Sequence, residues 1–277
     1  MDFASSPICY LVLISNVVLS YKGFQDPLFV DKHLFKTGRI LQHKEYDRLF
    51  YSGFLHADWM HLLFNMYSLY SFGTFLEASY GTLFFSCVYF LSLFGGNFLS
   101  LFLHRDEPFY AALGASGALC GVIFSAILAF PGLEVSMFFI PIGIPGWLFA
   151  ILYTLYSIYG IRTRRDNIGH DAHLGGAIIG TITTLVFLPY ILEQNALTVA
   201  AVLVPSTIFL FLLIRMPHLL GVEGSSPKKQ KRFSNDDHFN QIKAEKQKEL
   251  DRILDKINKS GMESLDDYEK RFLDMNK

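Results

Sequence analysis

The chain has 277 residues, of which 51% are apolar, 16% aromatic and only 18% charged, with a formal net charge of −1 at pH 7. A soluble globular protein carries about 25% charged residues, and here 25 of the 49 charged residues lie in positions 221–277. Uncharged apolar runs of membrane-spanning length recur through the first 220 residues, which excludes an ordinary soluble enzyme. The balanced charge gives no reason to expect a nucleic-acid partner, and three cysteines within apolar runs argue against a disulfide framework.

The apolar runs predict an all-α bundle of membrane-spanning helices. A helix needs about 20 mostly apolar residues to cross the hydrocarbon core of a bilayer. Such runs cover residues 7–24, 58–77, 81–103, 114–130, 137–159 and 170–192, and together they predict a six-span core over residues 1–192. The segment before the first run lacks a basic region, so we expect this run to remain as an anchor. Pro141 and Pro145 predict that the fifth helix is bent or starts late, because proline removes a backbone donor.

The segments outside these runs differ in composition. Residues 25–57 mix charged side chains with large apolar ones, which predicts a partly helical loop at the membrane surface rather than a disordered linker. Residues 193–217 contain another uncharged run, 197–214, which predicts a seventh span, with a surface-lying helix as the alternative. Residues 218–277 are highly charged and predict a polar linker followed by a small helical soluble tail.

Two signals in the tail predict a helical hairpin. Gly261 follows a partly amphipathic stretch and is typical of a helix stop. Ser264, with Asp267 three residues later, predicts the N-cap of a second short helix.

Groups of polar residues begin the second, fourth and sixth spans, where polar side chains are costly and indicate function. The groups are His56, His61 and Asn65 in HADWMHLLFN, Ser116 in GASG, and His170, Asp171 and His173 in GHDAHLGGAIIG. His61 and Asn65 are four residues apart and share one helix face, whereas His56 belongs to the junction before the helix. Since alternate spans run in the same direction, all three groups should lie at one face of the membrane.

Stripes of small residues predict which helices meet. The fourth span carries Gly114, Gly117 and Gly121 on one face, and the sixth carries His173, Gly176, Gly180 and Thr184. Such stripes let two helix backbones approach closely. If the two helices pack together, Ser116 and His173 lie near each other at the starts of their spans.

These residues match the requirements of acyl transfer. A serine hydroxyl is a weak nucleophile and needs a neighbouring base, and a histidine can take its proton and later give it to a leaving amine. The oxyanion of a tetrahedral intermediate needs hydrogen-bond donors, for which the Ser116 backbone N–H, the His61 ring and the Asn65 amide are candidates. The sequence therefore predicts a hydrolytic site inside a helical membrane bundle.

Other interpretations of the same residues remain. Glycine and serine are common packing material in spans, and Asn65 could simply bridge two helices. His56, His61, His170, Asp171 and His173 could form a zinc site, but the chain has no HExxH motif. A transporter could use intramembrane histidines for ions, although no paired inverted halves are visible.

The sequence resembles the rhomboid family of intramembrane serine proteases. The resemblance covers about residues 7–192 and is carried by His56-x4-His61-x3-Asn65, Gly114-Ala115-Ser116-Gly117 and Ala172-His173-x2-Gly176-x3-Gly180. It implies a six-helix core and a Ser–His dyad without a third acid, with no metal or cofactor. It also implies transmembrane protein substrates, cut in or near a helix. The expected protein is a multi-pass protein of a bacterial inner membrane. Its tail is also similar to tails on some bacterial members. A catalytically silent relative that binds and escorts transmembrane helices is the alternative.

The resemblance also implies a role for each matching residue. Ser116 is the expected nucleophile and His173 the general base and acid. The remaining roles are oxyanion donation by His61 and Asn65, bracing of the first loop by His56, shaping of the active-site turn and helix contact by Gly114 and Gly117, and gating by Phe64 opposite the fifth span.

Three features depart from the family pattern or from its topology. Asp47-Arg48 stands where members often have Trp-Arg, and Cys120 stands four residues after the nucleophile, where many members carry an aromatic that stacks on the histidine. The resemblance places the active-site face outside the cytoplasm, whereas the distribution of Lys and Arg favours the reverse. Because Cys120 replaces that aromatic, we expect His173 to have different contacts from the catalytic histidine of those family members.

Overall fold

Helices dominate both parts of the chain that the computed structural model describes, which are residues 3–137, 140–163, 166, 168–215, 250–259, 261–266, 269–270 and 273. They belong to two compact units, Met1–Ser225 and Ser226–Lys277. The long helices of the first unit are α1 (Pro7–Gln25), α7 (Thr82–Leu103), α8 (Ser116–Ala129), α9 (Gly146–Thr163), α10 (His170–Phe187) and α12 (Ala196–Arg215). The second apolar run forms α5 (Trp59–Ser68), the π-helical turn η3 (Leu69–Gly73) and α6 (Thr74–Tyr80). The all-α membrane bundle that the sequence predicts is confirmed.

Within the described residues, α1, α7 and α12 are long and apolar enough to cross a membrane by length and composition. The central helix α8 is apolar but has only 14 residues, fewer than the run 114–130 predicts. A helix of that length measures about 21 Å, less than the hydrocarbon thickness of about 30 Å. By length, α8 alone does not cross the hydrocarbon core.

Two other runs also differ from their predicted bounds. The fifth run begins as an antiparallel hairpin of β3 (Glu134–Met137) and β4 (Ile140–Pro145), and its helix starts only at Gly146, as the two prolines predict. The sixth helix ends at Phe187 rather than near 192, because Pro189 disfavours helical backbone before it. The short helix α11 (Ile191–Gln194) then leads into α12.

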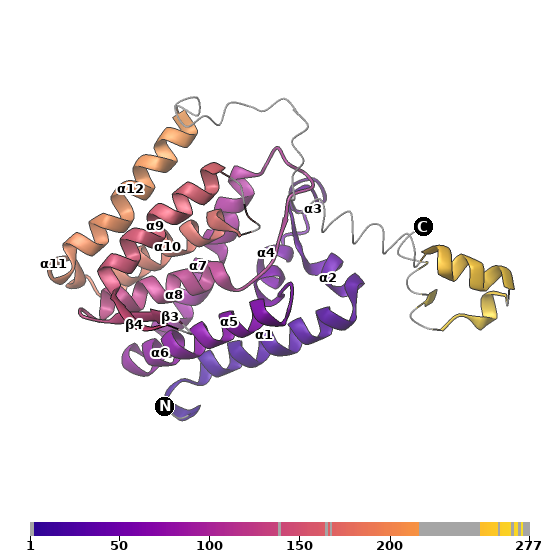
Figure 1. Ribbon diagram of the computed structural model, residues 1–277, viewed down its shortest axis with the longest axis horizontal. Coiled ribbons are helices and arrows are strands. Elements are labelled where there is room, and N and C mark those ends of the chain that lie inside the picture. Colours follow the sequence, from indigo (N-terminus) through magenta and orange to yellow (C-terminus); the bar gives the residue numbers. More distant parts are fainter. Residues whose placement is uncertain are drawn as a thin grey trace. The chain divides into compact units, whose positions relative to one another are not determined.

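The helices α7, α8 and α10 form the centre of the bundle (Figure 1). A Cβ atom added to Gly117 would lie 3.2 Å from the carbonyl oxygen of Ala172, and one added to Gly96 would lie 2.6 Å from the same oxygen. Added Cβ atoms on Gly176 and Gly180 would meet the α8 backbone at Gly117 and Gly121. The predicted small-residue stripes therefore face each other. Gly114 is an exception, because it precedes α8 and is not part of the stripe.

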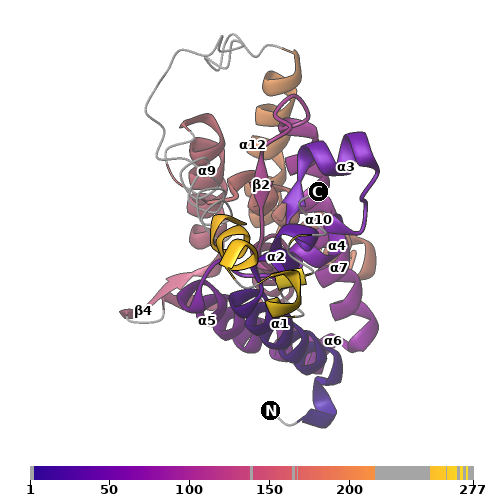
Figure 2. The same ribbon diagram turned by 90° about the vertical axis from the view of Figure 1, so that its right-hand side faces the viewer.

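The loop between the first two spans is partly helical, with α2 (Pro27–His33), α3 (Thr37–His43), α4 (Arg48–Tyr51) and the 3-10 turn η2 (Ser52–Phe54). A two-residue ribbon, β1 (Phe35–Lys36) with β2 (Ala111–Ala112), ties it to the turn before α8. In Figures 1 and 2, α2 lies next to α1, and α3 lies on the side of α2 away from α1.

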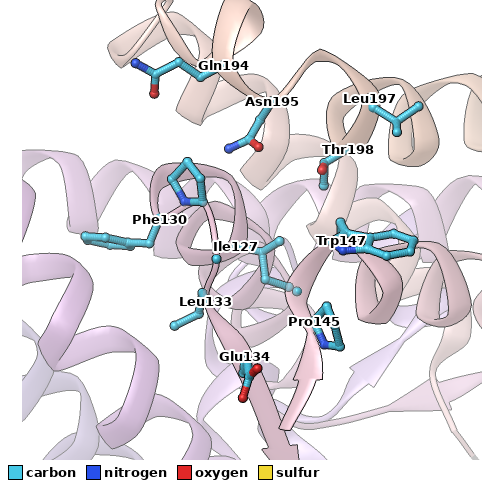
Figure 3. Close-up of a pocket in the computed structure, with 13 residues that line it drawn as sticks. Ile127, Phe130, Leu133, Glu134, Pro145, Trp147, Gln194, Asn195, Leu197 and Thr198 are labelled. Atoms are coloured by element: carbon cyan, nitrogen blue, oxygen red, sulfur yellow. The ribbon is translucent and has the colours of Figure 1, made fainter.

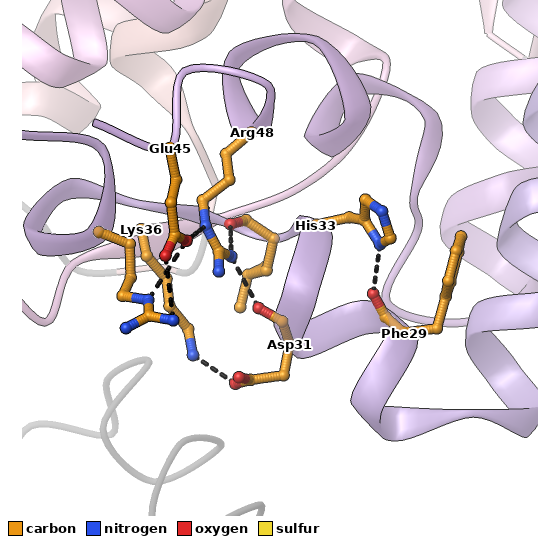
Figure 4. Close-up of polar contacts among 8 residues, drawn as sticks. Phe29, Asp31, His33, Lys36, Glu45 and Arg48 are labelled. Carbon is orange, nitrogen blue, oxygen red and sulfur yellow. Dashed lines mark hydrogen bonds and ion pairs between the residues drawn. The ribbon is translucent and has the colours of Figure 1, made fainter. Parts of the chain in front are cut away.

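Arg48 holds this loop together (Figure 4). The residue is 2% exposed, and its guanidinium donates to the carbonyl oxygens of Asp31 at 2.7 Å and Leu34 at 2.8 Å, and to the Glu45 carboxylate at 2.6 Å. Burial opposes the charge of Glu45, but the hydrogen bond to Arg48 and the charges of Arg48 and Arg39 outweigh it and lower the pKa of Glu45. Asp47 replaces the tryptophan of the family's Trp-Arg pair, but the arginine of that pair, Arg48, still has a structural role in the loop.

In the second unit, residues 250–259 are helical, and Gly261 ends this segment with a φ of +79°. The predicted cap at Ser264 is wrong, because Ser264 lies in the 3-10 turn η5 (Met262–Ser264). Asp266 accepts a hydrogen bond from the Glu269 N–H at 2.8 Å, and Glu269 accepts one from the Asp266 N–H at 2.9 Å. This reciprocal pair is a capping box. Asp266 takes the place of the usual serine or threonine at the N-cap, and Glu269 is the acid three residues later. Asp267 and most of the predicted linker lie outside the described residues.

Replacing Gly176 with leucine should disrupt the α8–α10 contact, since the added side chain has to occupy space filled by the α8 backbone. We expect the free energy of unfolding to fall by about 1–3 kcal/mol, the usual range for overpacking. Reversible unfolding in mixed detergent micelles measures this change. Val186→Leu is the matched control, because Val186 is 72% exposed on the same helix. Equal stability of the two variants would contradict the assigned contact.

Candidate active site

Ser116 and His173 lie at hydrogen-bond distance at the starts of two neighbouring helices. The Ser116 hydroxyl oxygen is 2.7 Å from Nε2 of His173. Ser116 is the first residue of α8, and His173 lies in the first turn of α10 and is only 8% exposed. The close contact of the two helices brings together side chains that are 57 residues apart.

The turn before Ser116 depends on Gly114. Its φ of +129° is one that residues with a side chain rarely adopt. An added Cβ would lie 2.9 Å from Cε1 and 3.0 Å from Nε2 of the His61 ring. The backbone N–H of Gly114 donates to the carbonyl oxygen of Ser52 at 3.0 Å. Gly114 therefore lets the loop turn sharply while the His61 ring packs against it.

His61 and Asn65 lie on α5 and face the same region. Asp58 caps this helix by accepting a hydrogen bond from the His61 N–H at 2.8 Å. Asn65 is 7% exposed, and its amide nitrogen is a buried donor without a hydrogen-bond partner among the described residues. A buried unpaired donor is costly and indicates a site that binds an acceptor. The arrangement could therefore receive a negatively charged oxygen.

His56 precedes α5 and supports the His61 ring from behind. Its Nδ1 atom is 2.9 Å from the Ser20 hydroxyl on α1, and its ring packs edge-on against His61 with centroids 4.9 Å apart. Burial, with a smaller effect of the neighbouring His61, lowers the pKa of His56 to about 3. A neutral His56 therefore joins α1 to the loop that carries His61.

Phe64, the residue predicted at the gate, lies on α5 and is 42% exposed. Ile144 of β4 and four residues of the predicted opposing helix α9 line an apolar hollow of about 200 Å³; the α9 residues are Phe149, Leu152, Tyr153 and Tyr156.

Tyr153 is a contact of the dyad that the sequence analysis missed. Its hydroxyl oxygen is 2.9 Å from Nδ1 of His173 and 3.3 Å from the Cys120 sulfur. Cys120 lies one turn after Ser116, in the position where an aromatic would be expected to stack on the histidine. A small residue at position 120 leaves space beside His173. This space could have indicated from the sequence that an aromatic residue of another helix contacts the histidine.

The acidic residues near His173 pair with other partners. Asp171 lies 3.2 Å from Nε2 of His104 and 3.3 Å from the Tyr110 hydroxyl, which connects the start of α10 to the end of α7. His170 lies 3.1 Å from Asp166. Three residues of the candidate zinc site thus have other partners: His56 pairs with Ser20, His170 with Asp166, and Asp171 with His104.

A pocket lies away from Ser116, at the other end of α8. It has a volume of about 460 Å³ and lies between the end of α8, the start of α9 and the α11–α12 corner (Figure 3). Glu134, Trp147 and Asn195 line it. Ser116 begins α8, whereas this pocket lies at the last turn of the same helix.

The His104 cluster predicts a pH-dependent contribution to stability. Both ring nitrogens of His104 face carboxylates, Asp171 at 3.2 Å and Glu107 at 3.2 Å, and its ring stacks on Tyr110 with centroids 3.5 Å apart. Burial opposes the charge, but the two carboxylates outweigh it and raise the pKa of His104 above its ordinary value.

A histidine whose pKa is raised on folding stabilises the folded protein. This stabilisation is complete at pH values below the unfolded-state pKa, and it is lost as pH rises through the folded-state pKa. His104→Gln should therefore lower the melting temperature at pH 5.5 more than at pH 9. Thermal unfolding of both proteins at the two pH values measures this, and an equal loss at both would contradict a charged His104.

Comparison with known proteins matches the two parts of the chain to different families. Residues 43–190 match the family model described as Rhomboid domain, and residues 234–276 match a family of unknown function, DUF6576.

Similar proteins come from several organisms. Rhomboid protein 1, mitochondrial, of Saccharomyces cerevisiae is 33% identical over 47% of this chain and 39% of its own length. RHOMBOID-like protein 12, mitochondrial, of Arabidopsis thaliana is 32% identical over 53% of this chain and 46% of its own length. Rhomboid protease AarA of Providencia stuartii is 26% identical over 60% of this chain and 66% of its own length. The chain thus spans less than half the length of the first two relatives.

Proposed function

Because this chain belongs to the rhomboid family and is an integral multi-pass membrane protein, we propose that it is an intramembrane serine protease. The proposed reaction is hydrolysis of peptide bonds in or near the transmembrane helices of membrane proteins. The observation that carries the proposal is the 2.7 Å contact between the Ser116 hydroxyl and Nε2 of His173.

The first step is attack by the Ser116 oxygen on the scissile carbonyl carbon. The hydroxyl donates its proton to Nε2 of His173 as the new carbon–oxygen bond forms. The carbonyl becomes a tetrahedral oxyanion, and the imidazole becomes an imidazolium. The close approach of α8 and α10 supports this step, because it holds the nucleophile and base in contact before substrate binds.

The oxyanion is stabilised by donors aimed at the Ser116 turn. The proposed donors are the Ser116 backbone N–H, the His61 ring and the Asn65 amide. The unpaired, buried amide nitrogen of Asn65 supports this role, as does the packing of the His61 ring against Gly114.

The intermediate collapses when the carbon–nitrogen bond breaks and the His173 imidazolium gives its proton to the leaving amine. The acyl group remains on the Ser116 oxygen. Water then attacks this ester with His173 as the base, which releases the new carboxyl group and restores the hydroxyl. No metal or cofactor enters these steps.

The substrates proposed for this site are single membrane-spanning segments that reach Ser116 from the side. The half-exposed Phe64 on α5 and the apolar hollow lined by α9 residues next to Tyr153 support an entry between these helices. The proposed location is a bacterial inner membrane, which the Providencia relative supports. The mitochondrial names of other relatives make a mitochondrial membrane the competing location.

Ser116→Ala and His173→Ala should each abolish cleavage of a model transmembrane substrate, because each removes one partner of the proton transfer. Product formation by the purified full-length protein in detergent, followed by mass spectrometry, measures this. The melting temperature of each variant is the control for folding.

A catalytically silent protein that only escorts transmembrane helices would bind the same substrate without cleaving it. It would also fail to react with a fluorophosphonate probe at Ser116. Normal turnover by either alanine variant would reject the dyad.

Asn65→Ala should lower kcat by about 10²–10³-fold, the usual effect of losing one oxyanion donor, while KM changes little. Steady-state cleavage kinetics measure both constants. Asn65→Asp is an informative companion, since a carboxylate of similar size repels the oxyanion and should be at least as inactive. An unchanged kcat in Asn65→Ala would remove this residue from the proposed site.

A further inference from the structure

We propose that Tyr153 is the positioning residue of the Ser116–His173 dyad. Its phenol oxygen accepts a hydrogen bond from Nδ1 of His173 and keeps Nε2 unprotonated and directed at Ser116. This inference rests on the proposed protease function and adds a third residue to its site.

The two contacts of the imidazole ring define the direction of each hydrogen bond. Nε2 lies 2.7 Å from the Ser116 hydroxyl and Nδ1 lies 2.9 Å from the Tyr153 hydroxyl. A neutral imidazole has one donor and one acceptor nitrogen. If Nε2 is to accept the Ser116 proton, the hydrogen must be on Nδ1, so the Tyr153 oxygen is the acceptor.

The Tyr153 hydroxyl hydrogen then needs an acceptor of its own. The Cys120 sulfur is 3.3 Å from the phenol oxygen, and a sulfur is a weak acceptor. A continuous chain of donors therefore runs from Ser116 through His173 and Tyr153 to Cys120. Because the hydroxyl hydrogen points to the thiol, the lone pairs of the Tyr153 oxygen remain available to the Nδ1 hydrogen.

The Tyr153 ring is held by aromatic neighbours. It stacks on Phe149 with centroids 5.4 Å apart and an interplanar angle of 20°, and it meets Phe124 of α8 edge-on at 6.0 Å. These contacts limit its rotation, so the phenol oxygen is presented to Nδ1 in one orientation.

A neutral phenol suits this position better than a carboxylate. An ionised group inside a membrane is costly unless it is paired, and here the nearby acids are paired elsewhere, Asp171 with His104 and Asp166 with His170. Tyr153 orients the imidazole and selects its tautomer without placing a charge beside it.

Tyr153→Phe tests the role, because it keeps the ring and removes only the oxygen. In the full-length protein we expect kcat to fall about 10–100-fold, less than the about 10⁴-fold lost when a triad with a charged acid has its tautomer reversed. KM should stay within about twofold, since Tyr153 acts through His173. The rate of Ser116 labelling by a fluorophosphonate should fall in parallel with kcat.

Tyr159→Phe is the matched control on the same helix. Tyr159 is 53% exposed, so loss of its hydroxyl should leave kcat and the labelling rate within about twofold of the wild type. A fall in kcat for Tyr153→Phe alone, with unchanged KM, separates positioning from a general loss of stability.

A second measurement needs no variant of Tyr153. The ¹⁵N spectrum of histidine-labelled wild-type protein, with His173→Ala for assignment, should show His173 with its hydrogen on Nδ1. A hydrogen on Nε2, or a kcat of Tyr153→Phe equal to that of Tyr159→Phe, would overturn the positioning role while Ser116-dependent cleavage stands. Absence of Ser116-dependent cleavage in the wild type would reject the protease function, and the positioning role with it.

Discussion

The close approach of α8 and α10 is the constraint on which the site depends. Helices in a bilayer gain little from the hydrophobic effect, because lipid tails are as apolar as leucine, so they associate through close packing and hydrogen bonds. Gly117 and Gly176 allow the two backbones to touch, and a hydrogen bond from the Ser125 hydroxyl to the carbonyl oxygen of Gly180 at 3.1 Å fastens the contact further along. With the backbones this near, the first turns of both helices bring Ser116 against His173.

Polar side chains secure the first helix to this centre at both ends. At its start, the buried Glu77 carboxylate accepts hydrogen bonds from the Ile8 N–H at 3.1 Å and the Cys9 N–H at 2.7 Å. A carboxylate at a helix N-terminus also interacts favourably with the helix dipole. Toward its other end, Ser20 contacts His56, which packs against His61. Through His56, Ser20 of α1 thus forms part of the support for His61, one of the candidate oxyanion donors.

Charge is kept away from the proposed dyad. Around His173 the direct hydrogen-bond partners are the neutral hydroxyls of Ser116 and Tyr153. The charged groups are paired at the end of the bundle, as with Asp171 and His104, where they join helix ends and loops. In the proposed reaction, the proton would therefore move between groups with no charged hydrogen-bond partner among the described residues. The pairing of the acids avoids the cost of an unpaired ion inside the membrane.

Hydropathy and helical periodicity determined much of this protein from its sequence alone. They predicted the order of the apolar helices, the late start of the fifth, and the pairing of two small-residue stripes that brings Ser116 and His173 together. Such patterns are readable because each depends on residues a few positions apart in one helix.

Only the tertiary structure decided the remaining features. Gly114 serves a turn with positive φ instead of a stripe, α8 is shorter than its apolar run, and Asp171 pairs with His104. The contact of Tyr153 with His173 is the clearest case, because it depends on how α8, α9 and α10 are rotated against one another. The sequence of any one helix does not determine this rotation, because the rotation depends on which side chains fill the space between all three helices.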